Sequence, residues 1–374
     1  MVDFRNQTDV PSSSQRLLSL DALRGFDMFW IVGAEDIVHA LQKVSHNSVV
    51  NFLSDQLQHK DWEGIAFYDL IFPLFVFIVG VSLVFSLSRS ISSAGRGVTM
   101  RRILTRSTLL YLFGILYYGG LSEGVGKMRL LGVLQRIAIC YLCAGLIFCT
   151  SKLRTMIVIC AALLIGYWAL MTFVPVPGHG AGNFAEGANL ANYVDSRYLP
   201  LRKWDGDHDP EGLLSTIPAI ATCLLGVFAG LLLKNAGISD RKKVLYLTGA
   251  GAGCVLLGFL WGLQFPVIKK IWTSSYVLVA GGYSCIFLAG FYLIVDVLKA
   301  RRWAMPFVWI GMNPIAIYLA HNFVNFRQLA LRFVGGPFQR VLGNYGELLT
   351  TFGILGITFL IVHFLYRRKI FLRL

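Results

Sequence analysis

The chain is a succession of apolar runs, each long enough to cross a lipid bilayer as a helix of about 20 residues. Hydrophobic residues make up 56% of the 374 residues and charged residues only 14%, whereas an average soluble domain has roughly 25% charged residues. This composition excludes a soluble enzyme, a disordered regulator and a disulfide scaffold. The sequence predicts an all-α integral membrane protein with about ten transmembrane helices. Gly, Pro and charged residues delimit these predicted spans, at about 20–42, 64–88, 103–121, 130–150, 154–175, 213–235, 244–264, 273–298, 304–322 and 346–366.

Positive charges are distributed unevenly between the segments that join the predicted spans. If both termini face the cytoplasm, 21 of the 34 Lys and Arg residues lie in cytoplasmic segments or at the cytoplasmic ends of the spans, and 12 lie in outer segments. This bias follows the positive-inside rule and predicts an N-in and C-in orientation in the cytoplasmic (inner) membrane. The formal net charge of +14 is therefore interpreted as a topology signal, and no nucleic-acid partner is expected.

The domain organisation is predicted to be simple. We expect one transmembrane domain over residues 16–374, preceded by a cytoplasmic tail at residues 1–15. Two outer loops are unusually long, at about 43–63 and 176–212, and loops of this length often carry function. Both combine acidic and aromatic residues, which suit a hydrated sugar or an amine better than a lipid. We predict that the two loops form one outward-facing site.

Polar residues inside the predicted spans give a sharper indication, because each charged group costs several kcal/mol in a bilayer unless it is paired or hydrated. Asp27 and Glu35 in the first span are eight residues apart and share a helical face. Later spans add Asp69, Gln135, Arg136, Asn313 and His321. One shared water-lined cavity is the least costly arrangement, and we predict it. The alternative is a set of structural pairs, such as Asp69 with Arg136, that fix helix register.

Several strings are similar to those of one family of membrane acetyltransferases. The first span opens with D-x-x-R-G at Asp21–Gly25, which two groups of membrane acyltransferases share. The strings that choose between the groups are HKDWEG at His59–Gly64, DLIFPLFVFIVG at Asp69–Gly80, LGVLQR at Leu131–Arg136, DPEGLL at Asp209–Leu214, GMN at Gly311–Asn313, and Tyr318-x-x-His321. In this order, over about residues 16–366, they resemble the heparan-α-glucosaminide N-acetyltransferases.

This resemblance implies a multi-span enzyme that takes acetyl-CoA from the cytoplasm and acetylates the amine of a terminal glucosamine on the far side of the membrane. It also implies a homodimer, and no metal is expected. The active-site histidine of the family falls on His59. Glu35 stands where the animal enzyme has an asparagine, and this departure leaves room for a different acceptor, such as a free amino sugar or a bacterial glycan.

Amide formation from a thioester needs a base for the amine proton and stabilisation of a tetrahedral oxyanion. The imidazole of His59 is predicted to act as the general base or as a nucleophile that carries the acetyl group transiently, and the sequence leaves both open. Asp69 is a candidate to orient His59 or to hold a positive charge. Glu35 is the third predicted catalytic residue, as a partner for the sugar ammonium.

The remaining candidates form three groups. The predicted substrate-binding residues are Asp36, Asp61, Trp62, Asp209 and Glu211. The predicted contacts to the pantetheine arm of acetyl-CoA are Arg24, Gln135, Arg136, Asn313 and His321. The basic clusters Arg101-Arg102 and Arg241–Lys243 are candidates for the CoA phosphates, although most such clusters only set topology.

Two other functions fit parts of the pattern. A secondary transporter of a small polar solute also carries intramembrane carboxylates and interrupted spans, but this sequence shows no two-fold repeat. An O-acetyltransferase of a surface polysaccharide shares the opening string at Asp21–Gly25. CoA binding distinguishes the acetyltransferases from the transporter, and dependence on an acceptor amine distinguishes N-transfer from O-transfer.

Overall fold

The apolar runs fold into helices throughout the part of the chain that the computed structural model describes. The described residues are 17–120, 122, 124–336, 341–343 and 345–371. The predicted tail at residues 1–15 lies outside them. Within these ranges there are three isolated β-bridges and no β-strand, so the predicted all-helical class is confirmed for the described residues.

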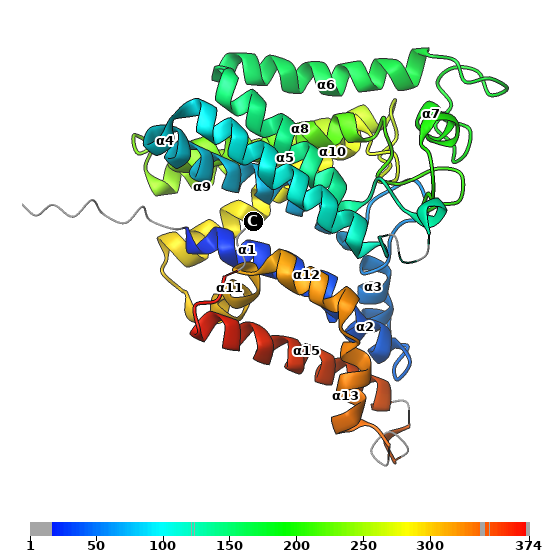
Figure 1. Ribbon diagram of the computed structural model, residues 1–374, viewed down its shortest axis with the longest axis vertical. Helices are drawn as coiled ribbons and strands as arrows, with labels where there is room; N and C mark the ends of the chain where they lie inside the picture. Colours follow the sequence, from blue (N-terminus) through cyan, green and yellow to red (C-terminus); the bar gives the residue numbers. More distant parts are fainter. Residues whose placement is uncertain (1–16, 121, 123, 337–340, 344, 372–374) are drawn as a thin grey trace, which may run out of the picture.

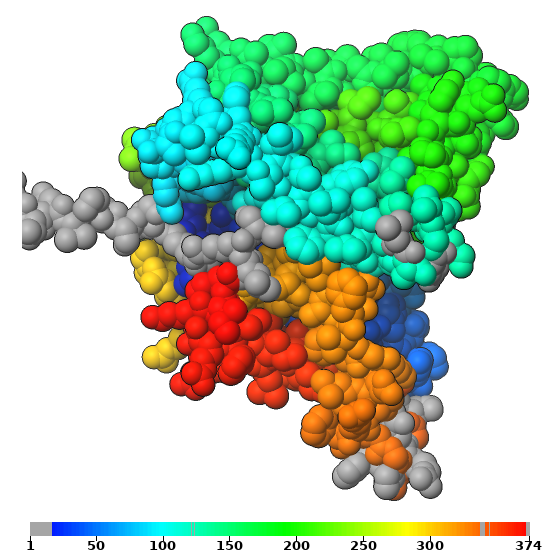
Figure 2. Space-filling model, in the orientation of Figure 1, coloured from blue at the N-terminus to red at the C-terminus, as the bar shows by residue number. Residues whose placement is uncertain are grey.

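Figure 1 shows the helices in two groups that lie side by side. The larger group contains α4 (Ile71–Tyr117), α5 (Val133–Thr150), α6 (Leu153–Phe173), α7 (Leu190–Tyr198), α8 (Thr216–Lys234), α9 (Asp240–Gly262) and α10 (Ser274–Phe291). The smaller group contains α1 (Leu18–Phe29), α2 (Glu35–Gln42), α3 (Ser48–Gln56), α11 (Met305–Gly311), α12 (Pro314–Phe323), α13 (Phe326–Val334) and α15 (Tyr345–Arg367). In Figure 2 a cleft opens between the cyan atoms of α4 and the red atoms of α15, and the dark blue atoms of α1 lie at its floor.

Among the described residues, seven helices are long and apolar enough to cross a membrane, or eight if α11 and α12 together form one span. The predicted count of ten spans is therefore not confirmed. The first predicted span is divided by a π-helical turn at Trp30–Ala34, where Gly33 has a φ of 113°, and it is not among the seven. The ninth is bent by 64° between α11 and α12. Local backbone breaks of this kind leave little trace in an apolar run.

Two predicted spans, 64–88 and 103–121, fall on the single long helix α4. Gly95 interrupts this helix with a φ of 80° and a ψ of 170°, a conformation that suits a residue without a Cβ. Arg102 then donates a hydrogen bond to the hydroxyl of Ser90 over 3.0 Å, although twelve residues of straight helix would separate them by about 18 Å. The chain therefore turns back at Gly95, and α4 is a hairpin of two legs.

Close helix contact holds the first leg of α4 against α8. A Cβ added to Gly80 would lie 2.0 Å from the carbonyl oxygen of Cys223, and one added to Gly226 would lie 2.0 Å from that of Phe77. Gly226 and Gly230 lie four positions apart on α8, and small residues at this spacing let two helix backbones approach closely. The contact fixes the start of α4, where Asp69 lies, beside the turn that leads into α8.

The two long outer loops come together at one end of the molecule, together with a third loop between α9 and α10. The indole of Trp62 donates to the carbonyl of Phe184 over 2.9 Å, which joins the first loop to the second. The backbone N–H of Gly64 donates to the carbonyl of Val267 over 2.9 Å, which joins the first loop to the third. The polar residues of three segments therefore converge.

Candidate functional site

His59 lies in a three-residue cluster with Asp69 and Lys269. Its Nδ1 is 2.9 Å from Oδ1 of Asp69. The Nζ of Lys269 is 2.8 Å from the same Nδ1, 3.2 Å from Nε2, and 3.2 Å from Oδ1 of Asp69. Asp69 is fully buried, whereas the His59 side chain is 53% exposed. The cluster thus presents an accessible imidazole on a buried carboxylate.

The local fold explains why Asp69 is fixed. It lies in the 3-10 turn Phe67–Leu70 that begins α4. Its second oxygen accepts the backbone N–H groups of Ala66 at 3.0 Å and Lys60 at 3.3 Å. The hydroxyl of Tyr276 donates to its backbone carbonyl over 2.7 Å. The carboxylate therefore ties the residue after His59 to the start of the helix, which fixes the backbone that carries the imidazole.

Lys269 comes from the loop between α9 and α10. The bridge between Glu63 and Ile268 holds this loop beside the His59 loop. Burial lowers the pKa of the Lys269 ammonium, and the adjacent carboxylate of Asp69 acts in the opposite direction. Glu35 and Glu211 both lie within electrostatic range of this lysine. Asp69, Glu211 and Glu35 thus all favour the charged form of Lys269.

A single ring nitrogen cannot donate to Asp69 and accept from Lys269 at the same time. When Nδ1 of His59 donates to the carboxylate, its Nε2 carries the free lone pair of the neutral ring. The ammonium of Lys269 then has Nε2 at 3.2 Å and Asp69 at 3.2 Å as its acceptors. In this tautomer Nε2 is the ring nitrogen that can accept a proton.

A second charged cluster centres on the buried side chain of Arg129. Its Nε donates to Asp209 over 2.9 Å, and its Nη2 donates to Asp209 over 2.6 Å and to Glu211 over 2.5 Å. The guanidinium also lies against the rings of Tyr118 and Trp204, with its carbon 4.5 Å and 4.9 Å from their centroids. Burial disfavours its charge, but the hydrogen bonds to Asp209 and the charge of Glu211 raise the pKa of Arg129 above its ordinary value.

The two clusters line one cavity of about 260 Å³, which we call the histidine cavity. Aromatic and basic side chains make up most of its wall. Its lining residues are His59, Lys60, Tyr118, Arg129, Val133, Trp204, Asp205, Pro210, Glu211, Lys269, Lys270 and Trp272. Of the predicted site residues, His59 and Glu211 line the cavity directly, while Asp69 and Asp209 lie behind it on His59 and Arg129.

The other residues predicted to contact the acceptor sugar lie outside this cavity lining. Glu35 is partly buried at the start of α2, in electrostatic range of Lys269. Asp36 is exposed, and its charge acts on Arg327. Asp61 is exposed in the loop after His59. Trp62 packs under the outer loops through its hydrogen bond to Phe184.

The residues predicted to contact acetyl-CoA, the acetyl donor, are divided between the two groups of helices. Gln135 donates to the carbonyl of Arg129 over 3.3 Å, and Arg136 bonds the hydroxyl of Ser215 with its guanidinium carbon 4.8 Å from the ring centroid of Trp272. Both side chains are fully buried behind the histidine cavity. The predicted pair of Arg136 with Asp69 is absent from the ion pairs of the described residues.

The other three residues predicted to contact acetyl-CoA lie in the smaller group of helices. Asn313 donates to the carbonyl of Ile370 over 3.0 Å. His321 bonds the carbonyl of Ile317 over 3.1 Å and is stacked on Phe326. Arg24 donates to the hydroxyl of Ser82 on α4 over 2.7 Å, which bridges the two groups. None of the three is part of the histidine cavity lining.

Two further hollows follow α4 and α5 away from the histidine cavity. A narrow apolar pocket shares Val133 with that cavity and is lined by Met28, Ile31, Phe72, Phe75, Val133, Leu134, Ile137, Pro314, Ile315 and Tyr318. A basic cavity of about 560 Å³ follows, lined by Ser86, Leu87, Ser90, Val98, Arg101, Arg102, Thr105, Arg106, Leu109 and Tyr141. The three hollows lie in this order along the first leg of α4 and along α5.

Sequence reasoning missed Lys269 and Arg129, the two cations that organise the site. Both were counted only as charges in outer segments. The positive-inside rule disfavours positive charge there, so this exception was the one available signal. Neither lies in the spans in which charged residues were sought, and their partners are distant in sequence, so the spacing of residues could not reveal the pairs.

Comparison with known proteins identifies the family. Residues 16–259 match the family described as heparan-alpha-glucosaminide N-acetyltransferase, catalytic. The heparan-alpha-glucosaminide N-acetyltransferase of Homo sapiens is 30% identical over 385 residues, which cover 84% of this chain and 55% of the human protein. The Mus musculus protein of the same name is 28% identical over 380 residues, or 83% of this chain and 54% of the mouse protein. The chain thus spans about half the length of the curated relatives it matches. Because the match covers well over half of the sequence, the chain belongs to the heparan-α-glucosaminide N-acetyltransferase family.

Proposed function

We propose that the protein is a transmembrane N-acetyltransferase that moves the acetyl group of acetyl-CoA to the amine of a glucosamine-type sugar on the outer (periplasmic) side of the inner membrane. The observation that carries the proposal is the cluster of His59, Asp69 and Lys269 on the wall of the histidine cavity. Family membership supports the reaction class. Ten spans, cytoplasmic termini and a homodimer complete the proposal.

The reaction forms one bond and breaks one. The neutral amine attacks the thioester carbonyl, a C–N bond forms, and the tetrahedral intermediate collapses with loss of the C–S bond. Nε2 of His59 takes the amine proton and returns it to the leaving thiolate, so the products are an amide and the CoA thiol. Asp69 orients the ring through Nδ1, in the manner of other carboxylate–histidine pairs.

The alternative route through an acetyl-histidine uses the same atoms. Nε2 of His59 would attack the thioester and release CoA before the amine arrives. This route predicts a burst of one equivalent of CoA in the absence of an acceptor. Direct transfer with both substrates bound predicts no burst, so rapid-mixing detection of the free thiol separates the two.

Lys269 has two roles in this proposal. Its ammonium, 2.8 Å from Nδ1 and 3.2 Å from Nε2 of His59, holds the imidazole ring in place beside Asp69. It also offers a fixed positive charge beside the position where the carbonyl oxygen becomes an oxyanion. Fixed charges aimed at a developing oxyanion are commonly the largest electrostatic contribution to catalysis.

The acceptor sugar is proposed to bind against Trp204 and Glu211. The Trp204 side chain is 57% exposed while its ring rests on the Arg129 guanidinium, so it offers a rigid apolar face to a sugar ring. Glu211 offers a carboxylate for hydroxyl or ammonium groups. Glu35 is close enough to Lys269 to influence its charge and remains the proposed partner of the incoming ammonium. The exposed Asp36 and Asp61 remain proposed as outlying contacts to the acceptor.

The donor is proposed to lie along α4 and α5. The apolar pocket would hold the linear pantetheine arm, with Gln135 and Arg136 at its acetyl end. The basic cavity would hold the nucleotide, with its phosphates on Arg101, Arg102 and Arg106. Arg24 donates a hydrogen bond to Ser82, which lies four positions before the cavity residue Ser86 on α4. Residues four apart are neighbours on a helix surface, so Arg24 lies about one helical turn from the basic cavity.

The test is transfer from labelled acetyl-CoA by the purified protein in detergent. Wild type should acetylate glucosamine but not N-acetylglucosamine, whose amine is blocked, and His59→Ala should lose most of the activity while keeping its thermal stability. Transfer to the blocked sugar would favour O-acetylation instead. Failure of both transfer and stabilisation by CoA would refute the acetyltransferase and favour the transporter.

A further inference from the structure

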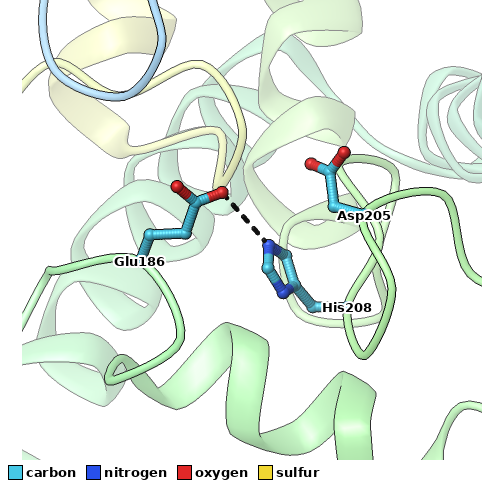
Figure 3. Close-up of side chains that lie close together, drawn as sticks. All are labelled: Glu186, Asp205 and His208. Atoms are coloured by element: carbon cyan, nitrogen blue, oxygen red, sulfur yellow. Dashed lines mark ion pairs between the residues drawn. The ribbon is translucent and has the colours of Figure 1, made fainter.

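A third polar cluster lies in the long loop between α6 and α8, apart from the His59 and Arg129 clusters. It consists of Glu186, Asp205 and His208 (Figure 3). One potential ligand atom from each residue lies within 4.8 Å of the other two. None of the steps proposed for acetyl transfer uses these three side chains, so their convergence calls for a separate explanation.

His208 has the orientation of a metal ligand. Its side chain is only 7% exposed. Its Nδ1 lies 2.7 Å from a carboxylate oxygen of Asp207, which can only accept, so Nδ1 carries the hydrogen. Its Nε2 points toward Glu186 at 3.6 Å (Figure 3) and has no hydrogen-bond partner among the described residues. Metal-binding histidines usually have their second ring nitrogen held by a carboxylate in this way.

The centre of the cluster already attracts a cation. The ammonium of Lys270 lies 3.1 Å from Oε1 of Glu186 and 3.2 Å from Oδ2 of Asp205. Two carboxylates facing the lone pair of a neutral imidazole would repel one another without such a charge. Lys270 therefore marks the position where positive charge is most stable.

We propose that Glu186, Asp205 and His208 bind a divalent transition-metal ion of the zinc class in place of the Lys270 ammonium. One imidazole nitrogen and two carboxylates suit zinc better than magnesium or calcium, which prefer oxygen ligands alone. Zinc requires ligand distances of about 2.0–2.2 Å, so the three groups must draw together. The side chain of Glu186 is 44% exposed and is free to make most of that movement.

The site is continuous with the histidine cavity, because Asp205 and Lys270 also line that cavity. Binding of the ion releases the Lys270 ammonium from both carboxylates. The ion thereby joins the segment after α7, which carries Trp204, to the part of the same loop that precedes α7. It acts as a clamp on the acceptor side of the cavity wall, distinct from the His59 chemistry.

The test is zinc binding to the full-length protein in detergent, measured by competition with a chromophoric chelator. Wild type should bind one equivalent. His208→Gln should weaken that binding at least tenfold, and Lys270→Gln should tighten it, because the competing ammonium is gone. His179→Gln, an exposed histidine of the same loop, is the matched control and should bind like wild type.

Two results would overturn the proposal. One is the absence of a saturable equivalent in both wild type and Lys270→Gln. The other is equal affinity in His208→Gln and wild type. If His208→Gln does not fold, Glu186→Gln replaces it: weaker binding in this variant with tighter binding in Lys270→Gln supports the site, and any other combination refutes it.

Discussion

The histidine cavity and the basic cavity differ in whether their positively charged side chains form ion pairs. In the histidine cavity, Arg129 and Lys269 are each paired with buried carboxylates at 2.5–3.2 Å. In the basic cavity, no acidic residue appears in the lining, and no ion pair involves Arg101, Arg102 or Arg106 within the described part of the chain. Paired charges hold a fixed geometry and are costly to separate, whereas unpaired charges are available to an incoming anion. The first cavity is therefore suited to catalysis and the second to binding phosphate.

The largest expected effect concerns the stability of the paired cavity. Arg129→Met leaves Asp209 and Glu211 buried without their cation, and breaking one side of a buried ion pair typically costs about 3–5 kcal/mol. Arg102→Met, its counterpart in the basic cavity, changes an exposed side chain and should cost about 0.5 kcal/mol or less. Equilibrium unfolding in mixed detergent micelles measures both. Equal losses of unfolding free energy in the two variants would contradict the difference between the paired and the unpaired cavity.

The second effect concerns catalysis at the paired cavity. Lys269→Met keeps the length of the side chain but removes its charge, and should lower kcat about 10²-fold without a comparable change in the KM for acetyl-CoA. Steady-state kinetics with glucosamine as the acceptor measure both constants. Lys60→Met changes another lysine of the same cavity lining and is the control, because Lys60 contacts Asp69 through its backbone N–H, which the substitution keeps. A kcat in Lys269→Met that matches the control would remove this lysine from the mechanism.

The third effect concerns the unpaired cavity. Arg102→Gln combined with Arg106→Gln should raise the KM for acetyl-CoA about tenfold or more, since each hydrogen bond between charged groups contributes about 1.5–3 kcal/mol, and kcat should change little. Acetyl-pantetheine lacks the nucleotide, so its use by the same variant should match that by wild type. An equal loss with both donors would show that the arginines do not bind the nucleotide.

The smallest effect is a change in pH dependence. Burial lowers the pKa of Lys269, so its positive charge is lost as the pH rises through a value below the ordinary lysine pKa of about 10.4. Wild-type kcat should therefore fall on the alkaline side before that value. In Lys269→Arg the guanidinium stays charged, and whatever activity remains should persist to higher pH. An unchanged alkaline limb would exclude Lys269 as its source.

The sequence alone was informative where function depends on neighbouring residues. His59 and Asp69 are only ten positions apart, and their strings predicted one site before any contact was known. The helical class followed from composition. The helical class rests on composition and hydrophobic patterning, whereas the role of His59 rests on the resemblance of its motif to the family.

The sequence failed where the site depends on the fold. Lys269 reaches His59 across 210 positions, and Arg129 reaches Asp209 across 80. The π-helical turn at Trp30–Ala34 and the bend between α11 and α12 interrupt two predicted spans without altering their hydrophobicity. Arg24, Asn313 and His321 were assigned to a common tunnel on polarity alone. Their hydrogen bonds lie at separate helix contacts, and their contact with acetyl-CoA stays a prediction. Polarity inside a span identifies a costly residue but not its partner.

The central claim is that His59 transfers an acetyl group between the two faces of a membrane. The most direct measurement uses proteoliposomes with labelled acetyl-CoA outside and glucosamine enclosed. It compares wild type with His59→Gln. The control is His46→Gln, which changes an exposed histidine of the same loop. We predict label on the enclosed sugar with wild type and His46→Gln, and at least a 10²-fold lower rate with His59→Gln. Label that reaches the sugar equally fast with His59→Gln, or only when both substrates are on the same side, would contradict the account.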